Sequence, residues 1–179
     1  MKILKKILLF LVALVIIALV AAALMPKSYT VTVSETINKP KAEVYDYVKI
    51  FANQKEYSEW IKPDPNLNLV ITGTDGTVGS KSYWKSTNSD VGEGSQTITA
   101  MSDDEISIDL AFISPMEGTG KVLNKFESKD STTTVLTVST IFDAPFPMNL
   151  PSILIGKPMI EKTEKQIMVN IKQILEAKQ

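Results

Sequence analysis

The stretch YTVTVSETINKPKAEVYDYV, residues 29–48, changes its hydrophobic period once and so indicates two elements in succession. As far as Ile37, apolar side chains alternate with hydroxyl side chains, which is typical of a half-buried strand. Pro40 is tolerated in the first turn of a helix, and apolar residues then recur at helical spacing. These residues are Val44, Tyr47, Val48 and Phe51. The sequence therefore predicts a strand that ends near Asn38 and a helix of about three turns after it.

Beyond a second helical turn at 54–59, the sequence predicts six more strands and one long helix. The strands are expected at 67–72, 80–87, 94–102, 106–113, 121–128 and 133–142, and the helix at 156–177. Such short links join antiparallel neighbours, because parallel pairing needs long crossovers. The expected fold class is therefore α+β. It has a curled antiparallel sheet of about seven strands, two short helices after the first strand, and a long C-terminal helix in the concave face.

Short strings of residues along the chain match one known arrangement. They are Tyr29-Thr30-Val31-Thr32-Val33, Ile37-Asn38-Lys39-Pro40, Val44-Tyr45-Asp46-Tyr47-Val48, Trp60, Gly79-Ser80 with Trp84, and Val91-Gly92-Glu93-Gly94-Ser95 with Ile98. Together with the order of elements, they resemble the helix-grip fold of the START-like (SRPBCC) superfamily over residues 28–177. That superfamily includes polyketide cyclases and dehydratases, Bet v 1-like allergens and lipid-transfer proteins. A membrane-tethered subgroup shares the lysine-rich start, the apolar helix and the Pro-Lys-Ser-Tyr ending, which stands here at 26–29.

The first 25 residues indicate a membrane segment. Three lysines precede an eighteen-residue run, 7–24, that contains no charge and no hydroxyl. As a helix this run is roughly 27 Å long, close to the roughly 30 Å hydrocarbon core of a bilayer. Two interpretations stay open: an uncleaved transmembrane anchor, or a secretory signal cleaved after the alanines at 21–23. Both interpretations place residues 28–179, the ligand-binding domain, outside the cytoplasm, with the N-terminus of an anchored chain inside. A cleaved chain would be secreted.

The composition excludes several classes of function. The chain has no cysteine, histidine or arginine, and after removal of the three N-terminal lysines it carries sixteen basic and twenty acidic residues. Phosphate backbones need a basic face, so nucleic acid is not an expected partner. Histidine and cysteine supply most zinc sites and the usual hydrolytic triads, so no metal, no cofactor and no catalytic residue is assigned.

In several of the expected strands, the alternation of residues predicts which side chains face the interior. Between the lysines at 81 and 85, the small residues Ser80, Ser82 and Ser86 share the opposite face with Trp84. Buried hydroxyls are costly without partners, so this face indicates either a cavity or serines that are bonded locally. An apolar wall follows in the next but one strand, formed by Ile106, Ile108, Leu110 and Phe112. Asn124 adds one amide between Val122 and Phe126.

Glu164 lies within the apolar stripe of the last helix. A carboxylate that faces a cavity has a raised pKa and can serve as a general acid or polar anchor. The alternative is that it leans out at the edge of the stripe, near Lys165 or solvent. The candidate ligand-binding set comprises Trp60, Ser82, Trp84, Ile108, Leu110, Phe112, Asn124, Phe126, Glu164 and Met168.

Three functional hypotheses follow from these residues and from the resemblance. The first is a membrane-tethered binding domain that encloses a small hydrophobic or amphipathic molecule, such as a lipid, between sheet and C-terminal helix. The second, which the resemblance permits, is an enzyme of the polyketide cyclase or dehydratase type that uses Glu164, a tyrosine or bound water. The third is an interaction module with a closed core. The oligomeric state stays open.

Overall fold

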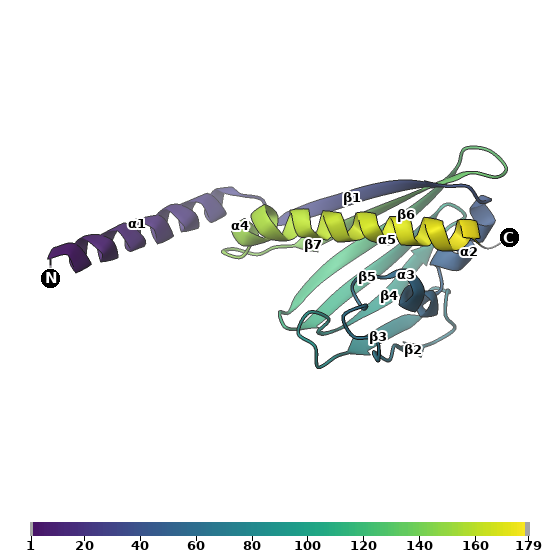
Figure 1. The fold of residues 1–179 in the computed structure, drawn as a ribbon, viewed down its shortest axis with the longest axis horizontal. Helices are drawn as coiled ribbons and strands as arrows, with labels where there is room; N and C mark the ends of the chain where they lie inside the picture. Colours follow the sequence, from purple (N-terminus) through teal and green to yellow (C-terminus); the bar gives the residue numbers. More distant parts are fainter. Residues whose placement is uncertain (1, 178–179) are drawn as a thin grey trace.

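The computed structural model describes residues 2–177, which form one long apolar helix followed by a curled sheet with a helix along it (Figure 1). The helices and helical turns are α1 (Lys2–Leu24), α2 (Lys41–Val48), η1 (Phe51–Asn53), α3 (Gln54–Tyr57), α4 (Asn149–Pro151), η2 (Ser152–Gly156) and α5 (Lys157–Ala177). The strands are β1 (Ser28–Ile37), β2 (Val70–Thr72), β3 (Lys81–Lys85), β4 (Glu93–Met101), β5 (Glu105–Ser114), β6 (Gly118–Ser128) and β7 (Thr134–Asp143).

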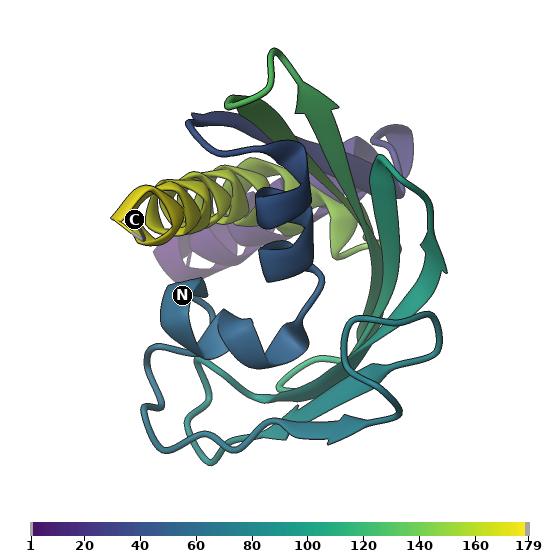
Figure 2. The ribbon, with the colours of Figure 1, turned by 90° about the vertical axis from the view of Figure 1, so that its right-hand side faces the viewer.

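The seven strands form one antiparallel sheet in the order β1-β7-β6-β5-β4-β3-β2. All neighbours except β1 and β7 are consecutive in sequence. The first strand closes the far edge, with Ser28 opposite Asp143 and Ile37 opposite Thr134. The curl and the long helix on the concave side are plain in Figure 2. The predicted α+β helix-grip fold, with its antiparallel meander and C-terminal helix, is confirmed.

Three predicted boundaries are wrong, and one of them is the start of β6, which lies at Gly118 instead of residue 121. The helix expected to reach Phe51 ends at Val48, because the carboxylate of Asp75 accepts hydrogen bonds from the backbone N–H groups of Phe51 and Ala52, at 2.9 and 3.0 Å. These bonds start a separate 3₁₀ turn. The strand expected at 67–72 is paired only from Val70 to Thr72, although Leu67 and Leu69 are buried ahead of it.

The tightly packed core occupies one half of the domain. The second half of α5 buries Ile167, Met168, Ile171 and Leu175, chiefly on the β1 side of the sheet. On the sheet they meet buried side chains that include Val31, Val33, Ile106, Ile108, Phe126 and Leu136. Complete burial of one such side chain stabilises the fold by about 1.5–3 kcal/mol. In the first half of α5, between Lys157 and Gln166, no side chain is fully buried.

The two ends of the sheet differ. At one end lie the link 25–27, the turns 86–92 and 115–117, and the segment 144–156; we call this the α1 end. A single amide fixes α1 there. The Asn149 Nδ2 group donates to the backbone oxygens of Ala22, Met25 and Pro26, at 2.7, 3.2 and 3.3 Å. Asn149 and Ala22 are both buried, so the junction between α1 and the domain is packed.

Candidate functional site

Four aromatic side chains form a continuous row on the inner face of the sheet at the α1 end. The ring of Trp84 in β3 meets that of Phe112 in β5 edge-on, with centroids 6.4 Å apart. Phe112 stacks on Phe142 of β7 at 6.4 Å, and Phe142 stacks on Tyr29 of β1 at 5.5 Å. All four side chains are only half-buried. We call this row the aromatic strip.

Glycine residues make room for the aromatic strip. Gly94 pairs with Trp84, and a Cβ atom at Gly94 would stand 2.5 Å from the indole ring and 2.7 Å from the backbone oxygen of Ala111. Gly120, opposite Phe142, would bring a Cβ within 3.0 Å of the Ile141 oxygen and 3.5 Å of the Phe142 ring. The rings therefore lie close against the backbone at Gly94 and Gly120. A side chain larger than hydrogen at either position would keep them from approaching so closely.

An open hollow lies on the other face of the sheet. It has a volume of about 480 Å³ and is lined by Ala111, Phe112, Ile113, Glu117, Gly118, Thr119, Asp143 and Pro145. These residues belong to the β5–β6 hairpin and to the end of β7, so the hollow lies at the α1 end. Ala111, Ile113, Thr119 and Asp143 alternate along their strands with the inward residues of the sheet, so this hollow opens on the outer face and does not lead to the aromatic strip.

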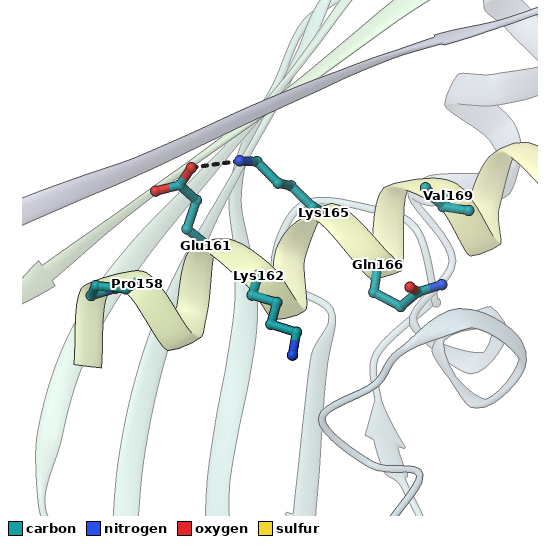
Figure 3. A pocket seen from close by; sticks show the side chains of 6 residues that line it. All are labelled: Pro158, Glu161, Lys162, Lys165, Gln166 and Val169. Carbon is teal, nitrogen blue, oxygen red and sulfur yellow. Dashed lines mark hydrogen bonds and ion pairs between the residues drawn. The ribbon is translucent and has the colours of Figure 1, made fainter. Parts of the chain in front are cut away.

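A second hollow, shown in Figure 3, lies on the side of α5 that faces away from its buried residues. All its lining residues come from α5: Pro158, Glu161, Lys162, Lys165, Gln166 and Val169. At helical spacing these positions face away from the buried Ile167 and Met168. Glu161 and Lys165 form an ion pair there at 2.6 Å. Because one solvated helix face makes up the whole hollow, we assign no ligand site to it.

Glu164 of α5 forms a polar contact with Trp60, in the segment that follows α3. The Trp60 Nε1–H group donates to the Glu164 Oε1 atom at 3.1 Å. Burial raises the pKa of Glu164 above its ordinary value, and the hydrogen bond from Trp60 partly offsets that rise. Lys165 pairs with Glu161, and Glu164 forms no ion pair with a lysine among the residues that the structure describes. The carboxylate is thus poorly solvated and uncompensated by positive charge.

Tyr57, at the end of α3, lies near enough to Glu164 to interact with its charge. Burial raises the pKa of the Tyr57 hydroxyl above the ordinary value; a hydrogen bond with the Gln54 side chain partly offsets this rise, and the charge of Glu164 adds to it. The backbone oxygen of Tyr57 accepts a hydrogen bond from Asn170 at 2.9 Å, which holds α3 against α5. The tyrosine therefore stays protonated and can donate a hydrogen bond.

The inward face of β3 is polar, as the flanking lysines predicted. Ser80 and Ser82 are buried, and the hydroxyl of neither has a hydrogen-bond partner among the described residues. Ser82 stands opposite Gln96, which exchanges two hydrogen bonds with Gln54 of α3, at 3.2 and 2.5 Å. The hydroxyl of Ser86, by contrast, donates to Asp64. Local bonding accounts for Ser86 but not for the other two serines.

The remaining sequence-predicted residues do not converge on one site. Leu110 joins Trp84 and Phe112 near the aromatic strip, while Trp60 and Glu164 form the separate polar contact. The others lie in the packed core: Ile108, Asn124, Phe126 and Met168. Phe126 packs against Tyr45 of α2, with centroids 4.9 Å apart, at the end of the sheet away from Phe112.

Sequence reasoning missed two members of the aromatic strip. Tyr29 is the second residue of β1, two positions before the buried Val31, so the alternation of that strand already placed it on the inner face. Phe142 lies in β7, which has apolar residues on both faces, so alternation alone leaves its phase open. The signal that was present is the conjunction of aromatic residues with Gly94, Gly118 and Gly120 in facing strands.

Within residues 2–177, no three acidic, cysteine or histidine side chains are grouped so that they could hold a metal ion. No family model matches the sequence, and no curated protein matches it. The comparison with solved structures, however, gives many matches to the fold.

Three similar structures illustrate these matches. Ara h 8.0201 superposes with a TM-score of 0.57 at 15% identity, covering 84% of this chain and 99% of its own. Norcoclaurine synthase from Thalictrum flavum, solved in complex with dopamine and hydroxybenzaldehyde, gives 0.61 at 12%, covering 85% and 88%. An uncharacterised protein from Bacillus thuringiensis gives 0.58 at 11%, covering 82% and 98%. This chain thus has the fold of Bet v 1-like proteins.

Proposed function

We propose that this domain binds a small apolar or amphipathic molecule between the aromatic strip and the first half of α5. The observation that carries the proposal is the strip itself: four rings in contact, on the concave face, all left half-buried. A row of this kind gains by covering its apolar surface, and ligand sites are concave, apolar and supplied with few polar groups. Faces of aromatic rings favour a flat or chain-like apolar ligand.

The polar contact at Glu164 supports an amphipathic ligand. Its carboxylate has a pKa raised by burial and, within the described part of the chain, a single hydrogen bond, from Trp60. A hydroxyl or amine on the ligand would donate to the free lone pairs and relieve the cost of burying the charge. Norcoclaurine synthase, which shares the fold, was solved with two small aromatic molecules that carry such groups, although its 12% identity limits the analogy to the fold.

The membrane part of the proposal rests on α1. This helix has 23 residues, a length of roughly 34 Å, and almost all of its apolar side chains exposed. It is long and apolar enough to cross a bilayer. With the N-terminal lysines on the cytoplasmic side, the domain would stand on the outer surface. Cleavage of this helix as a signal would instead release the same domain.

An enzymatic function of the polyketide cyclase or dehydratase type is the second candidate. It is favoured by the raised pKa of Glu164 and by the nearby protonated Tyr57, a pair that could donate or accept protons. Turnover of a polyketide-like substrate that is lost in Glu164→Gln, while ligand affinity is kept, would support it. Binding without turnover supports the carrier function.

Tryptophan fluorescence can test the proposed site, because Trp60 and Trp84 are the only two indoles. Full-length protein in mild detergent is titrated with oleate, farnesol and a naphthalene-based polarity dye. In the Trp60→Phe variant, binding should quench or shift the emission of the remaining Trp84. In Trp84→Phe, the change should be largely lost although the dye still binds.

A matched pair of substitutions, one on β5 and one on β7, tests whether the ligand binds to the inner face of the sheet. Phe112→Ser should weaken dye binding about tenfold or more, a change of about 1.4 kcal/mol, because it removes one of the two inner rings of the strip. Ile141→Ser, on the outer face and 41% exposed, should leave the affinity unchanged. Equal affinity in both variants, or no binding of any of the three probes, would refute the proposed function.

A further inference from the structure

Exposed apolar side chains gather at the α1 end of the domain. Outside α1, eleven large apolar side chains are exposed among the described residues, and seven of them lie in 113–116 and 146–159. These seven are Ile113, Met116, Phe146, Met148, Leu154, Ile155 and Met159, with exposed fractions from 46% to 71%. We call them the apolar rim. Solvent-facing surfaces rarely concentrate such residues without a partner.

The longer of the two rim segments is almost free of charge. The segment 144–159, APFPMNLPSILIGKPM, contains one charged residue, Lys157, whereas 22% of the whole chain is charged. Its helical turns, α4 and η2, leave Leu154 and Ile155 pointing away from the core at 62% and 71% exposure. A partner for this segment must therefore be apolar, while Glu117 and Asp143 border the shorter rim segment.

The geometry of the junction indicates which partner covers the rim. Asn149, within the same segment, holds the last turn of α1 by its bonds to Ala22 and Met25. The axis of α1 leads away from the domain at this end, as Figure 1 shows. Where α1 crosses a bilayer, the chain leaves the hydrocarbon within a few residues of Leu24, so the rim lies at the level of that bilayer's surface.

We propose that the apolar rim is a membrane-docking surface, which inserts into the outer leaflet of the bilayer that α1 spans. The inference rests on the membrane anchor in the proposed function. It adds a route for the ligand, because a Cβ at Gly156, beside Leu154 and Ile155 of the rim, would stand only 3.7 Å from the hydroxyl of Tyr29 in the aromatic strip. An apolar molecule can then pass from the acyl chains to the strip without crossing water. Aromatic and long aliphatic side chains are the residues that insert at such interfaces.

Depth-dependent quenching tests this surface, and the absence of cysteine makes unique labelling possible. Four full-length single-cysteine variants are made: Leu14→Cys in α1, Met116→Cys and Ile155→Cys in the rim, and Val78→Cys as control. Val78 is 58% exposed, in the loop that leads into the other end of β3. Each is labelled with a nitrobenzoxadiazole fluorophore and reconstituted into phosphatidylcholine–phosphatidylglycerol vesicles with and without spin-labelled lipid.

Labels at positions 14, 116 and 155 should be quenched several-fold more strongly than the label at 78. If the label at 14 is quenched while those at 116 and 155 match the control, the docking surface is refuted and a protein partner or a second copy is the occupant. If the label at 14 is not quenched, α1 does not insert, and the anchor and the docking surface fail together. None of these readouts depends on ligand binding, so a failure of the ligand site alone is distinguishable.

The ligand route has its own test. Leu154→Glu with Ile155→Glu should leave the affinity for dye added from solution unchanged. Uptake of the same dye from vesicle membranes should slow about tenfold, because acidic side chains oppose insertion. Val78→Glu is the matched control and should take up dye at the unaltered rate. Equal uptake rates in the two variants would refute the route.

Discussion

The hydroxyls of Ser80 and Ser82 are buried without hydrogen-bond partners among residues 2–177, at a cost of about 1–3 kcal/mol each when nothing satisfies them. Ser82→Ala should therefore raise stability by roughly 1 kcal/mol, which is about 2–4 °C in the melting temperature of a chain of this size. Ser86→Ala is the matched control. It removes a hydroxyl that bonds to Asp64 and should lower the melting temperature. Thermal unfolding followed by tryptophan emission measures both.

Destabilisation of Ser82→Ala by as much as the control would contradict the first expectation. It would mean that water or a ligand satisfies the Ser82 hydroxyl in solution.

Glu164 should make stability depend on pH. Its pKa in the folded protein is raised, chiefly by burial, so the folded state binds more protons than the unfolded state just above the ordinary glutamate pKa. Stability should then fall as the pH rises through the window between the two pKa values, and stay lower above it. Glu164→Gln keeps an acceptor for Trp60 and should remove this step, with its largest gain in stability near neutral pH.

Urea titrations of both proteins between pH 4 and 8 measure the effect of that substitution. A constant difference in unfolding free energy across the range would contradict a raised pKa. Glu161→Gln on the solvated face is a suitable control, since Glu161 pairs with Lys165 and burial is not its main influence.

At the residue scale, sequence patterns predicted the face of the sheet to which a side chain points better than they predicted its hydrogen-bond partner. The inward phase of Ser82 and Trp84 follows from the lysines on the other side of the strand. The bond between Trp60 and Glu164 joins residues 104 positions apart, and its geometry depends on where α3 ends. Periodicity describes the environment of one element, so it does not give contacts of this kind.

The two halves of α5 should contribute unequally to stability. Ile171 is 2% exposed and packs in the core, so Ile171→Ala should cost about 2–5 kcal/mol. Ile160, three turns earlier on the same stripe, is only half-buried, and Ile160→Ala should cost less than about half as much. Thermal unfolding of the two full-length variants in detergent gives the comparison. Equal losses would show that the first half of α5 is packed as tightly as the second.

At the element scale, the order of strands and the long last helix were predictable, because alternation, turn residues and short links each point to one topology. The end of α2 was not, since the residue that redirects the chain, Asp75, belongs to a distant loop. The division of α5 into a buried and a loosely covered half also depends on the curl of the sheet, which brings Trp84 and Phe142 into one row.

For the whole molecule, the anchor makes a simple prediction. Full-length protein should stay in the membrane fraction after high-salt and alkaline washing, because eighteen uncharged residues of α1 hold it in the bilayer. A variant that carries Leu11→Lys and Val15→Lys should move to the soluble fraction or fail to be exported. Recovery of a soluble mature chain that begins at Leu24 would instead establish signal cleavage and contradict the anchor.

The junction at Asn149 also sets an order in time. Asn149 follows Ala22 by 127 residues, an interval of roughly 6–25 s at the usual rates of synthesis. Throughout this interval α1 has already been made. The strand β1 stays unpaired until β7, its only neighbour in the sheet, has been synthesised. The sheet is thus completed while only the short link 25–27 connects the domain to α1. The orientation of the domain relative to α1 becomes fixed only when the last sixth of the chain, which begins near Asn149, has been made.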